Sequence, residues 1–267
     1  MRYFHNSKQN RIYFIMLKNT LFLLLFIFTK TISFAQIINI EEKRIKTRDS
    51  VEWYGECSLS ASFLQLNKKV VTLRGSAQVE YKKNKYLFLF LNDYSLLKAG
   101  NEAFENAAFQ HLRYNYKLKQ NLTLEAFGQA QNNKIQHINL RALLGTGLRW
   151  RMYKSGNGKN RLYLAMAYMQ EYNEFKNEKN QRFKRISSYL SGIYEPNTTM
   201  KFFTMTYYQP DILQIKNARL SSQNTCFLKI NKHLSFKVEF NMAYDPTLPP
   251  TINYWSYSWV NGLRWVI

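Results

Sequence analysis

INYWSYSWVNGLRWVI closes the chain at residues 252–267 and decides the predicted fold. From Trp255 onward, every second position except Asn261 holds a large apolar residue, and the positions between them are mostly small or polar. A period of two is that of a β-strand with one apolar face. The segment is long enough to cross a bilayer when tilted, and aromatic residues lie near both of its ends. We therefore predict a membrane-spanning strand, although it ends in Ile267 and the last strands of bacterial outer-membrane barrels usually end in an aromatic residue.

The same alternation recurs along most of the preceding chain. In residues 140–152, for example, Leu148 and Trp150 alternate with Arg149 and Arg151. This pattern predicts an all-β fold, a transmembrane antiparallel up-and-down β-barrel of about 12 strands with both termini on the periplasmic side. The predicted strands are 52–64, 70–82, 86–97, 111–118, 122–131, 140–152, 161–171, 183–194, 200–208, 219–230, 234–244 and 252–267.

The predicted connections are shorter on one side of the barrel than on the other. Asymmetry of this kind is typical of outer-membrane barrels, and it favours a barrel over the alternative of a soluble β-sandwich, which also has alternating strands. Short turns, mostly rich in Asn, Gly or Pro, are expected on the periplasmic side at 83–85, 119–121, 155–160, 195–198 and 231–233. Longer loops are expected at 98–103, 132–139, 173–182, 211–218 and 245–251, with 65–69 as a short exception.

An export signal precedes the predicted strands. The apolar run LFLLLFIF at residues 21–28 follows a basic segment, and Ser33 and Ala35 stand at the minus-three and minus-one positions of a cleavage site. This arrangement predicts a cleaved signal peptide at residues 1–35, with translation starting at Met1 or Met16. Residues 36–50 are then a polar periplasmic lead-in, and residues 51–267 form the outer-membrane β-barrel.

The composition argues against several classes of protein. Aromatic residues make up 16% of the chain while its mean hydropathy is negative, which suits neither a helical membrane protein nor a disordered chain. The net charge of +21 falls to +16 without residues 1–35, but the basic residues are spread over turns and alternate strand positions. Nucleic-acid binding requires positive charge gathered on one surface, so we expect no nucleic-acid partner.

No catalytic or metal-binding motif is evident in the sequence. Cys57 and Cys226 belong to no CxxC or Cys/His cluster and share the apolar strand phase, with a disulfide between them left open. His111 is the only histidine inside a predicted strand, and a hydrogen-bonded packing role is favoured over that of a base. Neither a nucleophile elbow nor a phosphate-binding glycine loop is found. We therefore predict a protein that is not an enzyme, with no metal and no cofactor.

The polar phase of the strands carries an excess of positive charge. The strongest candidates for lining the lumen are the bases Arg74, Arg113, Arg141, Arg149, Arg151 and Arg264 and the acids Glu80, Glu125 and Glu239. The same phase also holds Arg161, Arg185, Arg219, Lys229, Lys237, Glu52, Glu56 and Glu171.

Two interpretations of this lumen remain open. A small barrel filled by its own side chains has a plugged, salt-bridged lumen and a structural or interaction role, which we favour. A narrow water path with excess positive charge is instead an anion-preferring porin or small-solute channel. An outer-membrane hydrolase is the least supported function.

Several of the strands resemble a known family. FQHLRYNYKL (109–118), LRALLGTGLRW (140–150), SSYLSGIYEPN (187–197) and TYYQP (206–210) are similar to the uncharacterised outer-membrane family catalogued as domain of unknown function 481, also called salt-induced outer-membrane proteins, in its Bacteroidetes-like form. The resemblance covers most of residues 51–267. It implies a Gram-negative outer-membrane location and a β-barrel fold, and it brings no established activity or catalytic residues.

The expected partners follow from this location. The apolar strand faces meet outer-membrane lipid, and basic loop residues such as Lys176, Lys179, Arg182 and Lys216 are candidates for pairing with lipopolysaccharide phosphates. The C-terminal strand, from Trp255 to the end of the chain, is expected to engage the barrel-assembly machinery.

Overall fold

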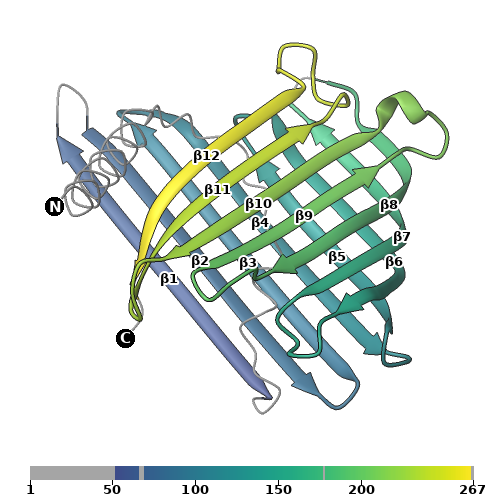
Figure 1. Cartoon of the computed structure of the whole chain (residues 1–267). Helices are drawn as coiled ribbons and strands as arrows, with labels where there is room; N and C mark the ends of the chain where they lie inside the picture. Colours follow the sequence, from purple (N-terminus) through teal and green to yellow (C-terminus); the bar gives the residue numbers. More distant parts are fainter. Residues whose placement is uncertain (1–51, 66–68, 177, 266–267) are drawn as a thin grey trace, which may run out of the picture. The chain divides into compact units, whose positions relative to one another are not determined.

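The computed structural model describes residues 52–65, 69–176 and 178–265 (Figure 1). The predicted signal peptide (1–35) and lead-in (36–50), and with them the choice of start residue, lie outside the described residues. No helix in the described part is long and apolar enough to cross a membrane. The elements are β1 (Trp53–Gln65), β2 (Lys69–Lys83), β3 (Tyr86–Ala99), β4 (Glu102–Lys117), β5 (Leu122–Asn133), β6 (Ile138–Lys154), β7 (Arg161–Phe175), β8 (Gln181–Tyr194), β9 (Met200–Gln209), the 3-10 turn η1 (Ile215–Asn217), β10 (Arg219–Lys229), β11 (Leu234–Tyr244) and β12 (Trp255–Trp265).

Each strand pairs antiparallel with its neighbours in the sequence. The sheet order therefore runs from β1 to β12 without a crossover, which confirms the predicted all-β, up-and-down fold of 12 strands. The register places Trp53 opposite Tyr81 in the first pair and Tyr244 opposite Trp255 in the last. Among the described residues no ladder joins β1 to β12, so these two strands are the edges of the sheet.

The sheet curls around an interior, because side chains of distant strands meet inside it. Tyr189 of β8 donates a hydrogen bond of 2.7 Å to Glu125 of β5. Arg141 of β6 lies 2.8 Å from Asp245, the residue that follows β11. A flat sheet holds neighbouring strands about 4.8 Å apart, so strands this distant in the order meet only if the sheet curves into a barrel. Figure 1 shows β8 to β11 passing in front of β3 to β6.

The two faces of the strands have opposite polarity. Along β7, Glu171 and Asn173 are buried, whereas Met166 and Tyr168 are exposed. Leu144 of β6 is 71% exposed. In a water-soluble protein the apolar residues are the buried ones. Here the outer face is apolar and much of the inner face is polar and charged, as the alternation in the sequence predicts.

Aromatic side chains gather at the strand ends. At the end of the barrel where β1 begins, the ring centroids of Trp53 and Tyr81 are 4.6 Å apart. At the opposite end, where β11 ends, those of Tyr244 and Trp255 are 4.8 Å apart. In membrane barrels, aromatic rings at the strand ends form girdles at the two membrane–water interfaces. The first end also carries the exposed rings of Tyr86, Phe88, Trp150, Tyr194 and Trp265.

Several strands extend further than the sequence predicts. β4 begins at Glu102 rather than at residue 111, because residues 102–109 continue the pairing with β3. Ala, Asn and Glu have low strand propensity, and cross-strand pairing overrides it here. The predicted loops 98–103 and 132–139 shrink to 100–101 and 134–137, so the predicted asymmetry of the connections is wrong for this half of the chain. The longest described connections are 210–218 and 245–254.

Gly147 marks a close approach between two strands. It lies in β6 opposite Ala167 of β7. A Cβ atom on Gly147 would clash with the carbonyl oxygen of Met166 and with the Cα atom of Ala167. Contacts this short with backbone atoms force the strands apart, because a paired backbone has no rotamer that relieves the clash.

We expect Gly147→Ala to lower the free energy of unfolding by about 1–3 kcal/mol, the usual cost of overpacking. Denaturant unfolding in detergent micelles, followed by tryptophan fluorescence, measures this loss. Gly262→Ala in β12 is the matched control, since a Cβ atom there meets no atom within 4 Å. Equal stability of the two variants would contradict the close packing of β6 against β7.

Candidate functional site

Five charged side chains form a buried cluster inside the sheet. They are Arg141 (β6), Glu171 (β7), Arg185 (β8), Arg219 (β10) and Asp245, and none is more than 8% exposed. The carboxylate of Glu171 is its centre: it lies 3.2 Å from Arg185 and 3.6 Å from Arg141, and it pairs with Arg219. We call these five residues the arginine cluster. The inward phase of four different strands brings its first four members together.

Asp245 completes the cluster from the loop between β11 and β12. Its carboxylate lies 2.8 Å from Arg141 and 3.8 Å from Arg219. Thr247 donates a backbone hydrogen bond of 3.1 Å and a hydroxyl hydrogen bond of 2.5 Å to it. Burial by itself raises the pKa of Asp245, but the two guanidinium groups and the Thr247 hydrogen bonds together outweigh burial and hold this pKa well below its ordinary value of 3.8.

Neutral groups bind several of the remaining polar atoms of the cluster. The side chain of Asn173 accepts a hydrogen bond of 2.9 Å from Arg141 and donates one of 2.8 Å to Glu171. Arg185 donates a hydrogen bond of 2.7 Å to the backbone carbonyl of Asn217. This last bond fastens the connection that carries η1 to the interior of the sheet.

The arginine cluster holds more positive than negative charge. Its three guanidinium groups face two carboxylates, so the net charge of the five side chains is +1. Two guanidinium nitrogens, Nη2 of Arg185 and Nε of Arg219, are buried without a hydrogen-bond partner in the described part of the chain. Because buried charge is costly unless it is paired, the cluster favours further negative charge beside it.

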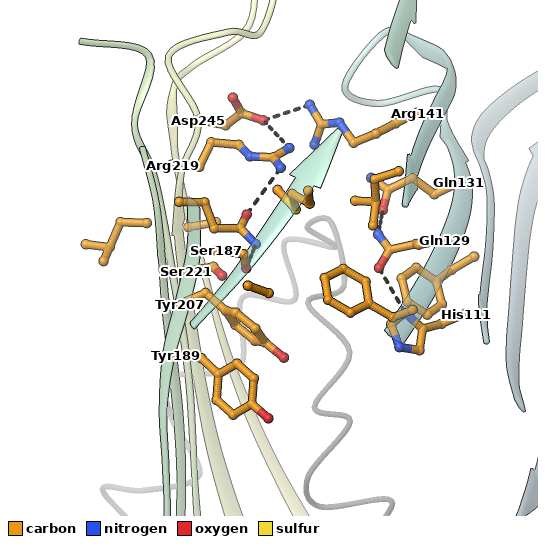
Figure 2. Close-up of a pocket in the computed structure, with 18 of the residues that line it drawn as sticks. His111, Gln129, Gln131, Arg141, Ser187, Tyr189, Tyr207, Arg219, Ser221 and Asp245 are labelled. Carbon is orange, nitrogen blue, oxygen red and sulfur yellow. Dashed lines mark hydrogen bonds and ion pairs between the residues drawn. The ribbon is translucent and has the colours of Figure 1, made fainter. Parts of the chain in front are cut away.

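A cavity of about 180 Å³ lies beside the arginine cluster (Figure 2). One end of it is formed by Arg141, Arg219 and Asp245. Across it, polar side chains of β4 and β5 face hydroxyl groups and rings of β8, β9 and β10. These facing residues are His111, Gln129 and Gln131 on one wall and Ser187, Tyr189, Tyr207 and Ser221 on the other. We call this cavity the chamber.

A second buried ion pair lies at the other end of the chamber. Arg113 is 3.3 Å from Glu125, which also accepts the hydrogen bond from Tyr189. His111 accepts a hydrogen bond from Arg113 at Nε2, and its Nδ1 lies 3.2 Å from the side-chain oxygen of Gln129. Both ring nitrogens thus lie within hydrogen-bond distance of neighbouring side chains, which suits the packing role predicted for His111.

The chamber brings together two of the nine predicted lumen residues. Arg113 and Arg141 line it, and Glu125, which is not part of the lining, pairs with Arg113. Glu80 is buried elsewhere in the interior. The side chains of these residues point inward because each belongs to the polar phase of its strand, which faces the interior.

The other predicted lumen residues lie away from the chamber. Arg149, Arg151 and Glu239 are half-buried, with the guanidinium of Arg149 stacked 3.7 Å above the ring of Tyr163. Arg74 is exposed, because it lies in β2 beside the edge strand of the sheet. The side chain of Arg264 lies outside the described structure.

Asp245 is the one member of the arginine cluster that sequence reasoning missed. The sequence predicts Asp245 in a long loop on the side opposite the periplasmic turns. In the structure this loop folds inward, and it buries Leu248 against Ile138 and Phe175. An apolar residue flanked by prolines, in the run DPTLPP at 245–250, is the signal that marks this loop as packed rather than solvated.

Neither cysteine chemistry nor a metal centre emerges from the geometry. Cys57 and Cys226 are free thiols, so the disulfide left open by the sequence is not formed. Over the ranges that the structure describes, no group of three or more His, Cys, Asp or Glu is placed to hold a metal ion.

The fold and interior define an all-β barrel with an apolar outer face and an ion-paired inside. The family described as "Protein of unknown function, DUF481" matches residues 57–253, and the chain belongs to this family, which confirms the resemblance seen in its strands. No match is found among curated proteins. Among solved structures, the chain is similar to the NanC porin in a rhombohedral crystal form, at 11% sequence identity and a TM-score of 0.46, over 80% of this chain and 98% of that chain.

Glu171→Gln removes the carboxylate that three guanidinium groups share. We expect the free energy of unfolding to fall by about 3–5 kcal/mol, because the variant leaves buried positive charges uncompensated. Glu52→Gln is the control: Glu52 forms an exposed pair with Lys83 at 3.7 Å, and its loss should cost about 1 kcal/mol or less. Denaturant unfolding of both variants checks this difference, and similar losses would contradict the central place of Glu171.

Asp245 should make the stability depend on pH. Because its pKa in the folded state lies below the ordinary 3.8, its ionised form stabilises the fold above pH 3.8, and this contribution is lost as the pH falls from 3.8 toward the folded-state value. We expect Asp245→Asn to be less stable than the wild type at neutral pH and to lose less stability between about pH 5 and pH 3. Unfolding midpoints measured over this range test the expectation; parallel pH profiles would refute it.

Proposed function

We propose that this chain is an outer-membrane β-barrel with a structural or interaction role, whose bore is blocked by its own ion-paired side chains. The observation that carries the proposal is the arginine cluster, which joins β6, β7, β8 and β10 to the β11–β12 loop across the interior. The Arg113, Glu125 and Tyr189 group adds a second bridge, from β4 and β5 to β8. Barrels of modest strand number are filled in this way by their own side chains.

The polarity of the outer face supports a membrane location. Large apolar residues point outward along the strands, with Leu144, Trp259 and Leu263 all more than 60% exposed. Water-soluble proteins do not leave apolar surface of this extent uncovered. Lipid is the solvent that stabilises such a face, and the predicted signal peptide supplies the route of export.

A narrow anion-preferring pore is the second candidate function. The excess positive charge of the arginine cluster and the half-buried Arg149 and Arg151 favour it, because a positively charged water path concentrates anions. We propose that the chain is not an enzyme. His111, the histidine considered as a possible base, has both ring nitrogens engaged by Arg113 and Gln129.

The proposed partners are membrane components. The apolar outer face binds lipid, and the basic residues of the connections bind lipopolysaccharide phosphates. The C-terminal strand engages the barrel-assembly machinery. Its described part, β12, is an edge strand with exposed aromatic residues, and a strand edge is where another protein can add a strand by backbone pairing.

Planar-bilayer recording separates the two candidate functions. For a blocked barrel we expect no steady single-channel steps from the wild-type protein. We expect steps only from a variant that removes side chains of both bridges, Arg113→Ser and Tyr189→Ser combined with Arg141→Ser and Asp245→Ser. Flotation of the protein with liposomes verifies insertion before each recording.

Steady wild-type conductance with a reversal potential that follows the chloride gradient would contradict the blocked barrel and support the anion pore. In that case Arg149→Ala tests whether this guanidinium contributes to the anion preference. Protein that remains soluble without detergent and does not float with liposomes would contradict the membrane location itself.

A further inference from the structure

We propose that the chamber is a binding site for a small organic acid that carries one carboxylate and several hydroxyl groups. The inference goes beyond the proposed function, because it concerns what the chamber binds and holds whether or not the bore conducts ions. It is carried by three features of the described residues: charge, hydrogen-bonding groups and size.

The charge of the arginine cluster calls for one anionic group. Arg141, Arg185 and Arg219 exceed Glu171 and Asp245 by one positive charge, in a region that is almost fully buried. One carboxylate beside Arg219 would bring the cluster to neutrality. The low polarity of a buried site makes such a charge-assisted contact stronger than one in water.

Arg219 supplies the donor for this contact. Its side chain lines the chamber, and the residue is 8% exposed. Its Nη2 pairs with Glu171 and donates to Gln209, whereas its Nη1 lies 3.8 Å from Asp245, which is beyond hydrogen-bond distance. The guanidinium is thus oriented by the protein, while the N–H groups of Nη1 are left to donate to a ligand.

The walls suit hydroxyl groups rather than a purely apolar molecule. Gln129 and Gln131 on one wall are linked by a hydrogen bond of 2.9 Å, and Gln209 donates one of 2.9 Å to the hydroxyl of Ser187 on the other. Ser221 lies beside them. Amide and hydroxyl groups both donate and accept, as sugar-like hydroxyl groups do, so a ligand with several hydroxyls matches both walls.

The size of the chamber and its tyrosines set the scale of the ligand. A cavity of about 150 Å³ is known to hold a benzene molecule, so the 180 Å³ of the chamber is suited to a single six-membered ring. The rings of Tyr189 and Tyr207, with centroids 5.2 Å apart, give one wall flat apolar surface against which such a ring can pack.

Isothermal titration calorimetry on the full-length protein in detergent tests this proposal with D-glucuronate and D-glucose, which share a six-membered ring and differ in the carboxylate. We expect D-glucuronate to bind at least about tenfold more tightly than D-glucose, since a hydrogen bond to a charged group is worth at least that factor. Equal affinity for the two sugars would overturn the proposal, and so would binding of neither. If only inorganic phosphate or chloride binds, the proposed ligand class is wrong.

Variants at the arginine locate the site. Arg219→Gln should weaken D-glucuronate binding by at least about tenfold, whereas Arg219→Lys, which keeps the charge near Glu171 but loses the planar set of guanidinium donors, should weaken it by less. Arg149→Gln is the matched control, because it removes an interior guanidinium outside the chamber and should leave the affinity unchanged. Heat-dependent migration on detergent gels shows that each variant is folded. D-glucuronate affinity that is equal in wild type and folded Arg219→Lys and Arg219→Gln would refute the assignment. The conductance recordings are independent of this result, so failure of either idea is recognised separately.

Discussion

Three guanidinium groups from three strands converge on the carboxylate of Glu171, and the interior of this barrel depends on that convergence. In this barrel the apolar residues lie largely on the outer face, so polar contacts must stabilise much of the interior. Buried charges are stable only when they are paired and hydrogen-bonded, and Asn173, Thr247 and backbone carbonyls bind several of the polar atoms that the ion pairs leave. The contacts that stabilise the interior are therefore also the ones that narrow its bore.

The same charges connect the structural and the ligand-binding proposals. A blocked bore needs side chains that bridge the interior, and a selective pocket needs side chains held in fixed positions. Arg219 serves both proposals, because Glu171 and Gln209 orient its guanidinium and its side chain lines the chamber. In the proposed blocked barrel the cavity lies between two ion-paired layers, where an open porin would have a continuous channel.

Local patterns in the sequence predict most of the architecture, because the alternation of a strand is a property of neighbouring residues. For β11, the first and last residues predicted from the sequence, Leu234 and Tyr244, are those observed in the structure. Alternation fails where both faces are apolar: in β3, Leu89 and Leu91 are fully buried while Phe88 and Phe90 are exposed. It also fails at the start of β4, where Ala, Asn and Glu lie in a strand only because β3 pairs with them.

By itself, the sequence determined that the chain forms antiparallel strands, which face of them is apolar, and that arginines and glutamates share the other face. Only the tertiary structure decided which of these charges meet. Arg141 and Asp245 are 104 residues apart, and they come into contact because the sheet curls and the β11–β12 loop folds inward on Leu248. Strand phase is read from local periodicity, whereas a contact across the interior depends on the curvature and register of all the strands between the two residues, which no local pattern encodes.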